Sequence, residues 1–378
     1  MSELNNKLNN NYSVVLATDF TFLGHSIICK GYLYTKYGIN SRIFYINETT
    51  KEGELIIGEN EILIPLSIKA TKYSAHLPNC LVMNPREINY LDDKQSGGQF
   101  IDNLGIPNIP TFYNHKNQTE ENLKGFLNNF SSDSLFCIKG RNNLASENIK
   151  CVRKNDVLSF YKDSKNNLKD SIIQLYIESD YLISIDCVCQ EGNIESFIVD
   201  RSPLFLGKDK KSPRNRYLTS ESHDILNENS GNIFYDRVYQ YTKHIVYTTK
   251  YNGFIQIEWL CREKENLLLF LEFNPRVSGS ITFSNYREID NISLPYIDTL
   301  VLKYLLIILK RKDTEITKNF ITNIKTKIPA KNSLPKKVTH PQFNFVMRPI
   351  LIILTVIVLL LLIDKITIFD YQQIKQIK

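Results

Sequence analysis

Two carboxylates stand within strand-like apolar runs near the middle of the chain. Glu258 lies in the run FIQIEWL, and Glu272 lies in the run LLLFLEFNPR. If these runs pair as a hairpin, the two side chains meet on one face, and Asn274 points the same way as Glu272. Because unpaired buried carboxylates are costly, the pattern favours a bound metal ion or a basic partner. The plainer alternative is that both are edge-strand residues facing water.

Two carboxylates and an amide oxygen form an oxygen-only ligand set, which suits Mg²⁺ that also holds phosphate oxygens. Arg276 follows on the same face, where a guanidinium can bind a phosphate group through two hydrogen bonds. The segment therefore predicts a site for a metal-bound phosphate compound.

This segment resembles the metal-binding signature of the ATP-grasp superfamily. It is most similar to the branch of the carbamoyl-phosphate synthase large chain and biotin carboxylase, in which an acidic or amide residue precedes an E-x-N-P-R run by fourteen positions. The interval from Glu258 to Glu272 has the same length. The resemblance covers roughly residues 12–310. It implies Mg-ATP chemistry, in which a carboxylate is phosphorylated and an amine or similar nucleophile then attacks the acyl phosphate.

The resemblance also implies roles for particular residues. Mg²⁺, or alternatively Mn²⁺, would be held by Glu258, Glu272 and Asn274. Arg276 would stabilise the phosphorylated intermediate, and Lys139, at a strand end, would neutralise phosphate charge during catalysis.

Nucleotide binding is implied at three further places, because Lys94 would contact ATP phosphates while Gln174 and Ile177 would occupy the hinge that contacts adenine. Two features depart from the superfamily pattern. Residues 141–149 contain no glycine, and Tyr181 stands where a ribose-binding glutamate is usual. The alternative function is therefore a catalytically degenerate ATP-grasp protein that acts as a nucleotide-binding or scaffold protein at a membrane.

Hydrophobic patterning predicts the elements that would position these residues. We expect strands at 12–18, 41–46, 81–83 and 134–140, a first helix that ends at Gly38, and another that begins at Asn84-Pro85. A closing amphipathic helix is expected at 296–310. The predicted fold class is α/β, of the α+β ATP-grasp type. A Rossmann-like domain (1–110) precedes an ATP-grasp domain of two α+β subdomains (111–312), a basic linker (313–345) and a C-terminal hydrophobic helix (346–378).

A general base is not assigned by the sequence. His223 and His244 lie near the region and are the histidines we consider, although either could be structural. Residues 201–223 carry six Lys or Arg and are interpreted as a solvated insertion or as a loop that recruits an anionic substrate. The carboxylate and amine substrates and the oligomeric state are left open.

Charge and cysteine content narrow the cellular setting. Residues 301–378 carry 14 Lys or Arg against 4 Asp or Glu, so the remaining chain is slightly acidic although the total charge is +6. This distribution argues against nucleic-acid binding by the body and favours a membrane surface. The seven cysteines are odd in number and scattered, which predicts reduced and largely buried thiols.

The C-terminal segment is the predicted membrane contact. Residues 349–363 contain no charge, and eleven basic residues lie between 303 and 348. We expect residues 346–378 to tether a cytoplasmic body to the membrane, because basic flanks stay on the cytoplasmic side. The segment is short for a span, and a buried core helix is the alternative.

Overall fold

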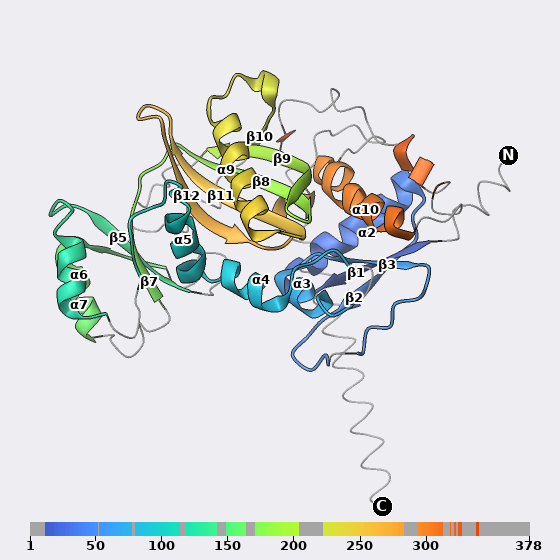
Figure 1. Ribbon diagram of the computed structural model, residues 1–378, viewed down its shortest axis with the longest axis horizontal. Helices are drawn as coiled ribbons and strands as arrows, with labels where there is room; N and C mark the ends of the chain where they lie inside the picture. Colours follow the sequence, from blue (N-terminus) through green and yellow to red (C-terminus); the bar gives the residue numbers. More distant parts are fainter. Residues whose placement is uncertain are drawn as a thin grey trace, which may run out of the picture.

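The computed structural model describes most of the chain up to residue 312 and a few residues beyond it (Figure 1). The described residues are 12–51, 53–77, 80–113, 118–141, 149–163, 171–203, 222–282, 294–312, 318, 321–322, 324–326 and 338–339.

A three-stranded parallel sheet opens the fold. Its strands β1 (Ser13–Thr18), β2 (Ser41–Tyr45) and β3 (Glu61–Pro65) lie in the order β2-β1-β3. Helix α2 (Leu23–Tyr37) and helix α3 (Ile68–Ser74) cover its two faces, each with its own apolar cluster. Helix α2 ends at Gly38, whose left-handed φ of 70° favours glycine. The predictions for 12–18, 41–46 and the first helix are confirmed.

The passage to the next domain differs from the prediction. Residues 80–84 form no strand, and the N–H of Leu81 instead donates to the Tyr304 hydroxyl at 2.8 Å. The helix expected from Asn84-Pro85 is divided into α4 (Pro85–Asp92) and α5 (Lys94–Asn103). Asp93 causes the break, because it has an extended backbone and caps α5 by accepting from the N–H groups of Gln95 and Ser96.

A small antiparallel sheet follows. It has the order β4-β7-β5-β6, built from β4 (Thr111–Tyr113), β5 (Leu135–Gly140), β6 (Lys150–Arg153) and β7 (Ser171–Leu175). Helices α6 (Glu120–Leu127) and α7 (Lys154–Asp163) cover one face, where Phe112 and Phe136 are among the buried residues. The other face carries polar side chains. We call this unit the small sheet.

The second antiparallel sheet has six strands in the order β12-β11-β8-β9-β10-β13. Its long strands are β8 (Tyr181–Gln190), β9 (Asn193–Pro203), β11 (Gly253–Arg262) and β12 (Leu267–Asn274), with β10 (Ser222–Leu226) and β13 (Val338–Thr339) at one edge. Helix α9 (Phe234–Thr249) packs on one face against a core that includes Ile257 and Trp259 (Figure 1). We call this unit the large sheet.

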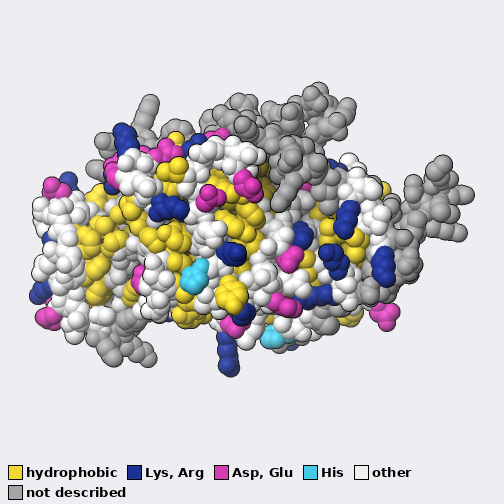
Figure 2. All heavy atoms as spheres, turned by 45° about the horizontal axis from the view of Figure 1, so that its top comes forward, with side chains coloured by type: hydrophobic (Ala, Val, Ile, Leu, Met, Phe, Trp, Pro, Cys, Tyr) yellow, Lys and Arg dark blue, Asp and Glu magenta, His cyan; other side chains and the backbone are white. Residues whose placement is uncertain are grey.

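Figure 2 shows the molecule turned by 45° about the horizontal axis, so that the top of Figure 1 comes forward. Figure 2 shows positive and negative side chains interspersed on this face, with hydrophobic side chains gathered between them.

The end of the described chain packs back onto the first domain. A π-helical turn (Ile297–Val301) leads into α10 (Leu302–Lys312), which confirms the closing helix. The helix is more buried than an amphipathic surface helix, since Tyr304 to Leu309 are all buried, and it packs with α2 and β3. Part of the predicted linker also belongs to the body, because Val338–Thr339 pair with β10.

No helix among the described residues is long and apolar enough to cross a membrane. The predicted anchor at 346–378 lies outside the described residues.

A buried acid joins the closing helical segment to the first domain. The Asp298 carboxylate is 4% exposed and accepts hydrogen bonds from the hydroxyls of Tyr32 and Tyr37, at 2.9 and 2.6 Å, and from Lys36 Nζ at 2.8 Å. Three donors on α2 thus bind one side chain, that of Asp298, which lies more than 250 residues later in the chain.

We expect Asp298→Ala to destabilise the protein by roughly 2–4 kcal/mol, because the substitution leaves buried tyrosine hydroxyls and an ammonium group without their acceptor. Urea unfolding measures the effect. Asp298→Asn keeps an acceptor oxygen and should lose less stability. An unchanged unfolding midpoint for Asp298→Ala would show that this junction contributes nothing.

Candidate functional site

Polar side chains form two rows across the face of the large sheet that α9 does not cover. In one row Glu272, Glu258, Ser184 and Asp200 occupy paired positions on β12, β11, β8 and β9. In the adjacent row Asn274, Gln256 and Asp186 are paired on β12, β11 and β8. A strand alternates its faces, so these positions share one side of the sheet. We call these two rows the polar face of the large sheet, whereas the side that α9 covers is apolar.

The two glutamates at the start of the first row lie directly opposite each other. Glu258 pairs with Glu272, but the next pair is Trp259 with Phe270, so β12 contains one extra residue at this point. The bulge allows Glu272 to face the polar side while Phe270, two residues away, stays in the core against Trp259. Bulges are common next to functional sites because they redirect a side chain in this way.

The two carboxyl groups have opposite pKa shifts. Burial and the neighbouring Glu272 raise the pKa of Glu258 well above its ordinary value. Burial alone would also raise the pKa of Glu272, but Lys94 and Lys139 outweigh it and hold the pKa below the ordinary value. Glu258 thus carries the proton of the pair, and Glu272 carries the negative charge.

Lys94 reaches Glu272 from the first turn of α5. Its Nζ lies 3.5 Å from Glu272 Oε2, and both side chains are largely buried. The start of α5 is fixed by Asp93, whose Oδ2 pairs with the guanidinium of Arg141 at 2.6 Å. The N–H of Lys94 also donates to the Arg141 carbonyl at 3.1 Å. Residues at the end of β5 therefore position Lys94.

Lys139 comes from the polar face of the small sheet. Its Nζ donates to Gln174 Oε1 at 2.6 Å, and Gln174 Nε2 donates to Thr111 Oγ1 at 3.1 Å. Both polar ends of Gln174 are therefore engaged, the oxygen with Lys139 and the nitrogen with Thr111. Gln174 lies within β7, and Ile177 lies just beyond it, where its carbonyl accepts from Ser179 Oγ at 3.3 Å.

Arg276 lies at the end of the polar face nearest the first domain. It donates to Asn274 Oδ1 at 3.1 Å and to the Val277 carbonyl at 3.0 Å. Its guanidinium lies over the ring of Phe22, 5.1 Å from the centroid. Burial and this guanidinium lower the pKa of His25, which keeps the imidazole neutral. The first domain thus contacts the site through the segment that follows β1.

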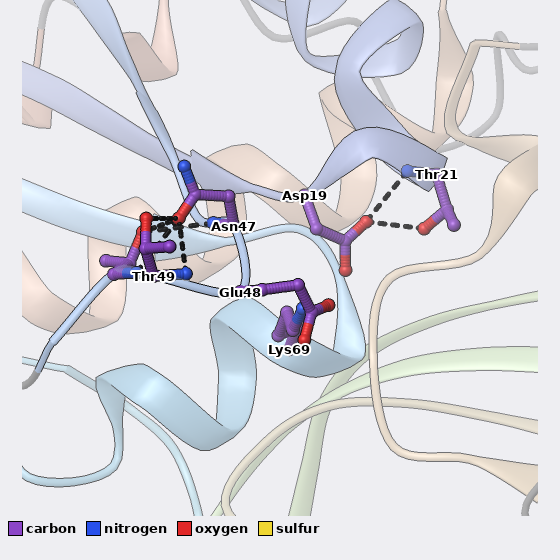
Figure 3. Close-up of polar contacts among 7 residues, drawn as sticks. Asp19, Thr21, Asn47, Glu48, Thr49 and Lys69 are labelled. Atoms are coloured by element: carbon purple, nitrogen blue, oxygen red, sulfur yellow. Dashed lines mark hydrogen bonds and ion pairs between the residues drawn. The ribbon is translucent and has the colours of Figure 1, made fainter.

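The carboxyl ends of β1 and β2 carry further polar side chains near this segment (Figure 3). Asp19 Oδ1 accepts from the N–H of Thr21 at 2.9 Å, and Lys69 Nζ pairs with Glu48 Oε1 at 2.7 Å. Open α/β sheets bind ligands at the carboxyl ends of their strands. The three-stranded sheet therefore presents polar side chains at the edge where folds of this class bind ligands.

Several functional residues were missed by the sequence reasoning. Asp186 and Asp200 are each 2% exposed on the polar face, and burial with the Asp200 carboxylate raises the pKa of Asp186 well above its ordinary value. The alternation of Ser184 and Asp186 in an apolar strand was a readable signal. No local signal pointed to His25, or to the contact of Arg141 with Asp93.

Other sequence candidates lie elsewhere or are already engaged. His244 is exposed on α9, which covers the opposite face of the large sheet. Arg201 pairs with Asp224 and Glu263, so this residue belongs to a surface ion network rather than to an anion-recruiting loop. The side chain of His223 and residues 204–221 lie outside what the structure describes.

No family model matches the sequence, and no curated protein matches it. Solved structures do share its fold. D-alanyl-alanine synthetase A from Vibrio cholerae is 11% identical with a TM-score of 0.51, and the match covers 84% of this chain and 99% of that one. D-cycloserine synthetase DcsG is 11% identical with a TM-score of 0.50, covering 70% and 92%.

A third similar structure is the biotin carboxylase domain of the 2-oxoglutarate carboxylase from Hydrogenobacter thermophilus, in complex with MgADP, ADP and bicarbonate. It is 13% identical with a TM-score of 0.50, and the match covers 72% of this chain and 66% of that one. This chain has the ATP-grasp fold. The small sheet and the polar face of the large sheet are its two halves around the site.

The donor set formed by Glu258, Glu272 and Asn274 fits a divalent cation. Glu258 and Glu272 face each other at one pair of positions, and a cation would take the place of the proton that they share. Asn274 Oδ1 accepts from Arg276, so it would exchange this hydrogen bond for a metal contact. The described residues contain no group of three or more His, Cys, Asp or Glu side chains arranged for a metal, and the set consists of two carboxylates and an amide.

We expect Mg²⁺ binding to release a proton at neutral pH, because Glu258 must ionise before both carboxylates can hold the cation. Because the pKa of Glu258 is raised, this residue is protonated before Mg²⁺ binds, and binding releases a proton rather than taking one up. Affinity should rise as the pH increases towards this pKa and level off above it. Calorimetry with ATP present, in two buffers of different ionisation enthalpy, counts the protons. The Glu258→Gln variant should bind Mg²⁺ more weakly and release no proton. Binding by the wild type that does not depend on pH would contradict the assignment of the proton to Glu258.

Proposed function

We propose that this protein is an ATP- and Mg²⁺-dependent ligase that activates a carboxylate as an acyl phosphate for attack by an amine or similar nucleophile. The observation that carries the proposal is the convergence of Lys94, Lys139 and Arg276 on the Glu258–Glu272 pair. Cations from three separate elements surround one carboxylate pair, which is an arrangement for a polyphosphate with its metal ion. The shared fold with ATP-grasp ligases supports it.

Each side chain has a task that its position supports. Glu258, Glu272 and Asn274 would hold Mg²⁺, which draws the phosphate oxygens together and neutralises their charge. Lys94 and Lys139 would hold the phosphates from two sides. Such chemistry depends mainly on positioning and on charge stabilisation, because the reacting groups need little covalent help.

The nucleotide base would lie towards the small sheet. Ile177 follows β7 at the join between the two sheets, where its main chain would contact adenine. Gln174 is better suited to fixing Lys139 than to contacting the base, because both of its polar ends already have partners. We therefore propose that Gln174 positions Lys139 at the phosphates instead of contacting the base.

The acyl phosphate would form beside Arg276. A guanidinium stabilises the negative charge that develops on a phosphorylated carboxylate. His25, whose pKa burial and Arg276 lower, would accept a proton from the attacking amine. The substrates would enter from the edge of the first domain that carries Asp19.

We expect Glu272→Gln to lower Mg-ATP turnover by about 100-fold or more, because the change removes the charged ligand of the pair while it preserves shape. ADP release, measured over a panel of carboxylates paired with amines, reports the loss. Glu265→Gln on the exposed turn of the same hairpin is the matched control and should retain activity. Retained turnover in Glu272→Gln would refute the ligase proposal.

The wild-type protein must first bind Mg-ATP in calorimetry. Binding without ADP release over the whole panel would favour the alternative of a nucleotide-binding or scaffold protein. If the folded protein does not bind Mg-ATP, both proposed functions are ruled out.

We also propose that residues 346–378 tether the catalytic body to the cytoplasmic side of a membrane. The support is the uncharged stretch at 349–363 with its basic N-terminal flank. Removal of 346–378 should move the expressed protein from the membrane pellet to the supernatant and leave Mg-ATP binding unchanged. A truncated protein that still sediments with membranes, or a full-length protein that does not, would contradict the tether.

A further inference from the structure

Two cysteines face each other across the small sheet. Cys137 on β5 and Cys151 on β6 are directly paired in an antiparallel register, and their Sγ atoms lie 2.9 Å apart. Directly opposite residues in such a pair have Cα atoms about 4.5–5.5 Å apart. A disulfide spans Cα separations of about 4.4–6.8 Å. The backbone is therefore already in position for a covalent bond.

The other five cysteines lack this geometry or this reactivity. Cys187 and Cys189 are both buried within one strand, and burial raises the pKa of Cys187 well above its ordinary value, which keeps this thiol protonated. Burial raises the pKa of Cys29, Cys80 and Cys261 to about 12 in each case, which keeps these thiols protonated and unreactive.

We infer that Cys137 and Cys151 form a site of reversible oxidation, where a peroxide converts the facing thiols into a cross-strand disulfide. Cys151 is half-buried and is the thiol that the oxidant reaches, while Cys137 is buried behind it. Hydrogen peroxide oxidises the first thiol to a sulfenic acid and leaves one water. The second sulfur then attacks the sulfenic sulfur, the S–S bond forms, and a second water leaves. A thiol reductant reverses the bond by exchange.

A disulfide between Cys137 and Cys151 would affect Lys139, because the two cysteines lie in a row of residues next to it. Cys137 is also paired with Gln174 on its other side, and Gln174 is paired with Thr111, so the four residues form one row on the polar face of the small sheet. Gln174 holds Lys139 at 2.6 Å. A disulfide at the end of this row fixes β5 relative to β6 and restricts Lys139. This consequence rests on the proposed function, whereas the disulfide itself does not.

Peptide mapping tests the bond directly. The full-length protein is treated with hydrogen peroxide, capped with N-ethylmaleimide and digested with trypsin. We expect residues 125–139 and 151–153 to appear as one linked species, two hydrogens lighter than the sum, that dithiothreitol separates. Cys137→Ser and Cys151→Ser should lose it, and Cys80→Ala, which removes another half-buried thiol, should keep it. Separate capping of both thiols, overoxidation to sulfinic acid, or linkage to a different cysteine would overturn the inference.

Two further measurements test what the bond does. Oxidation should raise the thermal midpoint of the wild type by several degrees and leave that of Cys151→Ser unchanged, because the bond restricts the unfolded chain. Affinity for Mg-ATP should fall by about threefold or more and recover with dithiothreitol. Equal affinity in both states would overturn the regulatory consequence. A linked peptide without nucleotide binding in either state would support the oxidation site and refute the proposed function.

Discussion

The site depends on one electrostatic constraint, which is that two carboxylates occupy directly opposed positions on a buried face. Glu258 and Glu272 cannot both be charged there without compensation, and the structure compensates them from outside the large sheet. Lys94 supplies one charge from α5, and Lys139 supplies another from the small sheet. Helix α5, the small sheet and the large sheet therefore meet at the two acids.

Specific polar contacts hold these units together around the acids. Asp93 caps α5 with one carboxylate oxygen and binds Arg141 of the small sheet with the other, so one side chain places both Lys94 and the end of β5. On the opposite side, Arg276 lies over the ring of Phe22 and brings the first domain to the large sheet. The contact of Asp93 with Arg141 uses charged groups at the edges of elements, which can separate and reform more readily than an apolar interface.

The sequence predicted the parts of the site that strand geometry controls. The two-residue period places Glu272 with Asn274, and the hairpin brings them to Glu258. The bulge that separates Glu272 from Phe270 was not predicted, because it depends on the core that Phe270 must fill. The contact of Gln174 with Lys139 was not predicted, since Lys139 lies 35 residues away and only the strand pairing brings the two together. Contacts distant in sequence leave no periodic signal.

The protonation of the Glu258–Glu272 pair depends on the position of the small sheet. Lys139 belongs to that sheet, yet it lowers the pKa of Glu272 on the large sheet. A movement that withdraws Lys139 weakens this effect and favours the proton on the pair, whereas a movement towards the acids favours their ionisation. A phosphate group between the sheets would attract Lys139 away from the acids, and the metal ion would then take over the compensation of their charge. Under the proposed function, nucleotide and metal would together replace the contacts that Lys139 makes with the acids.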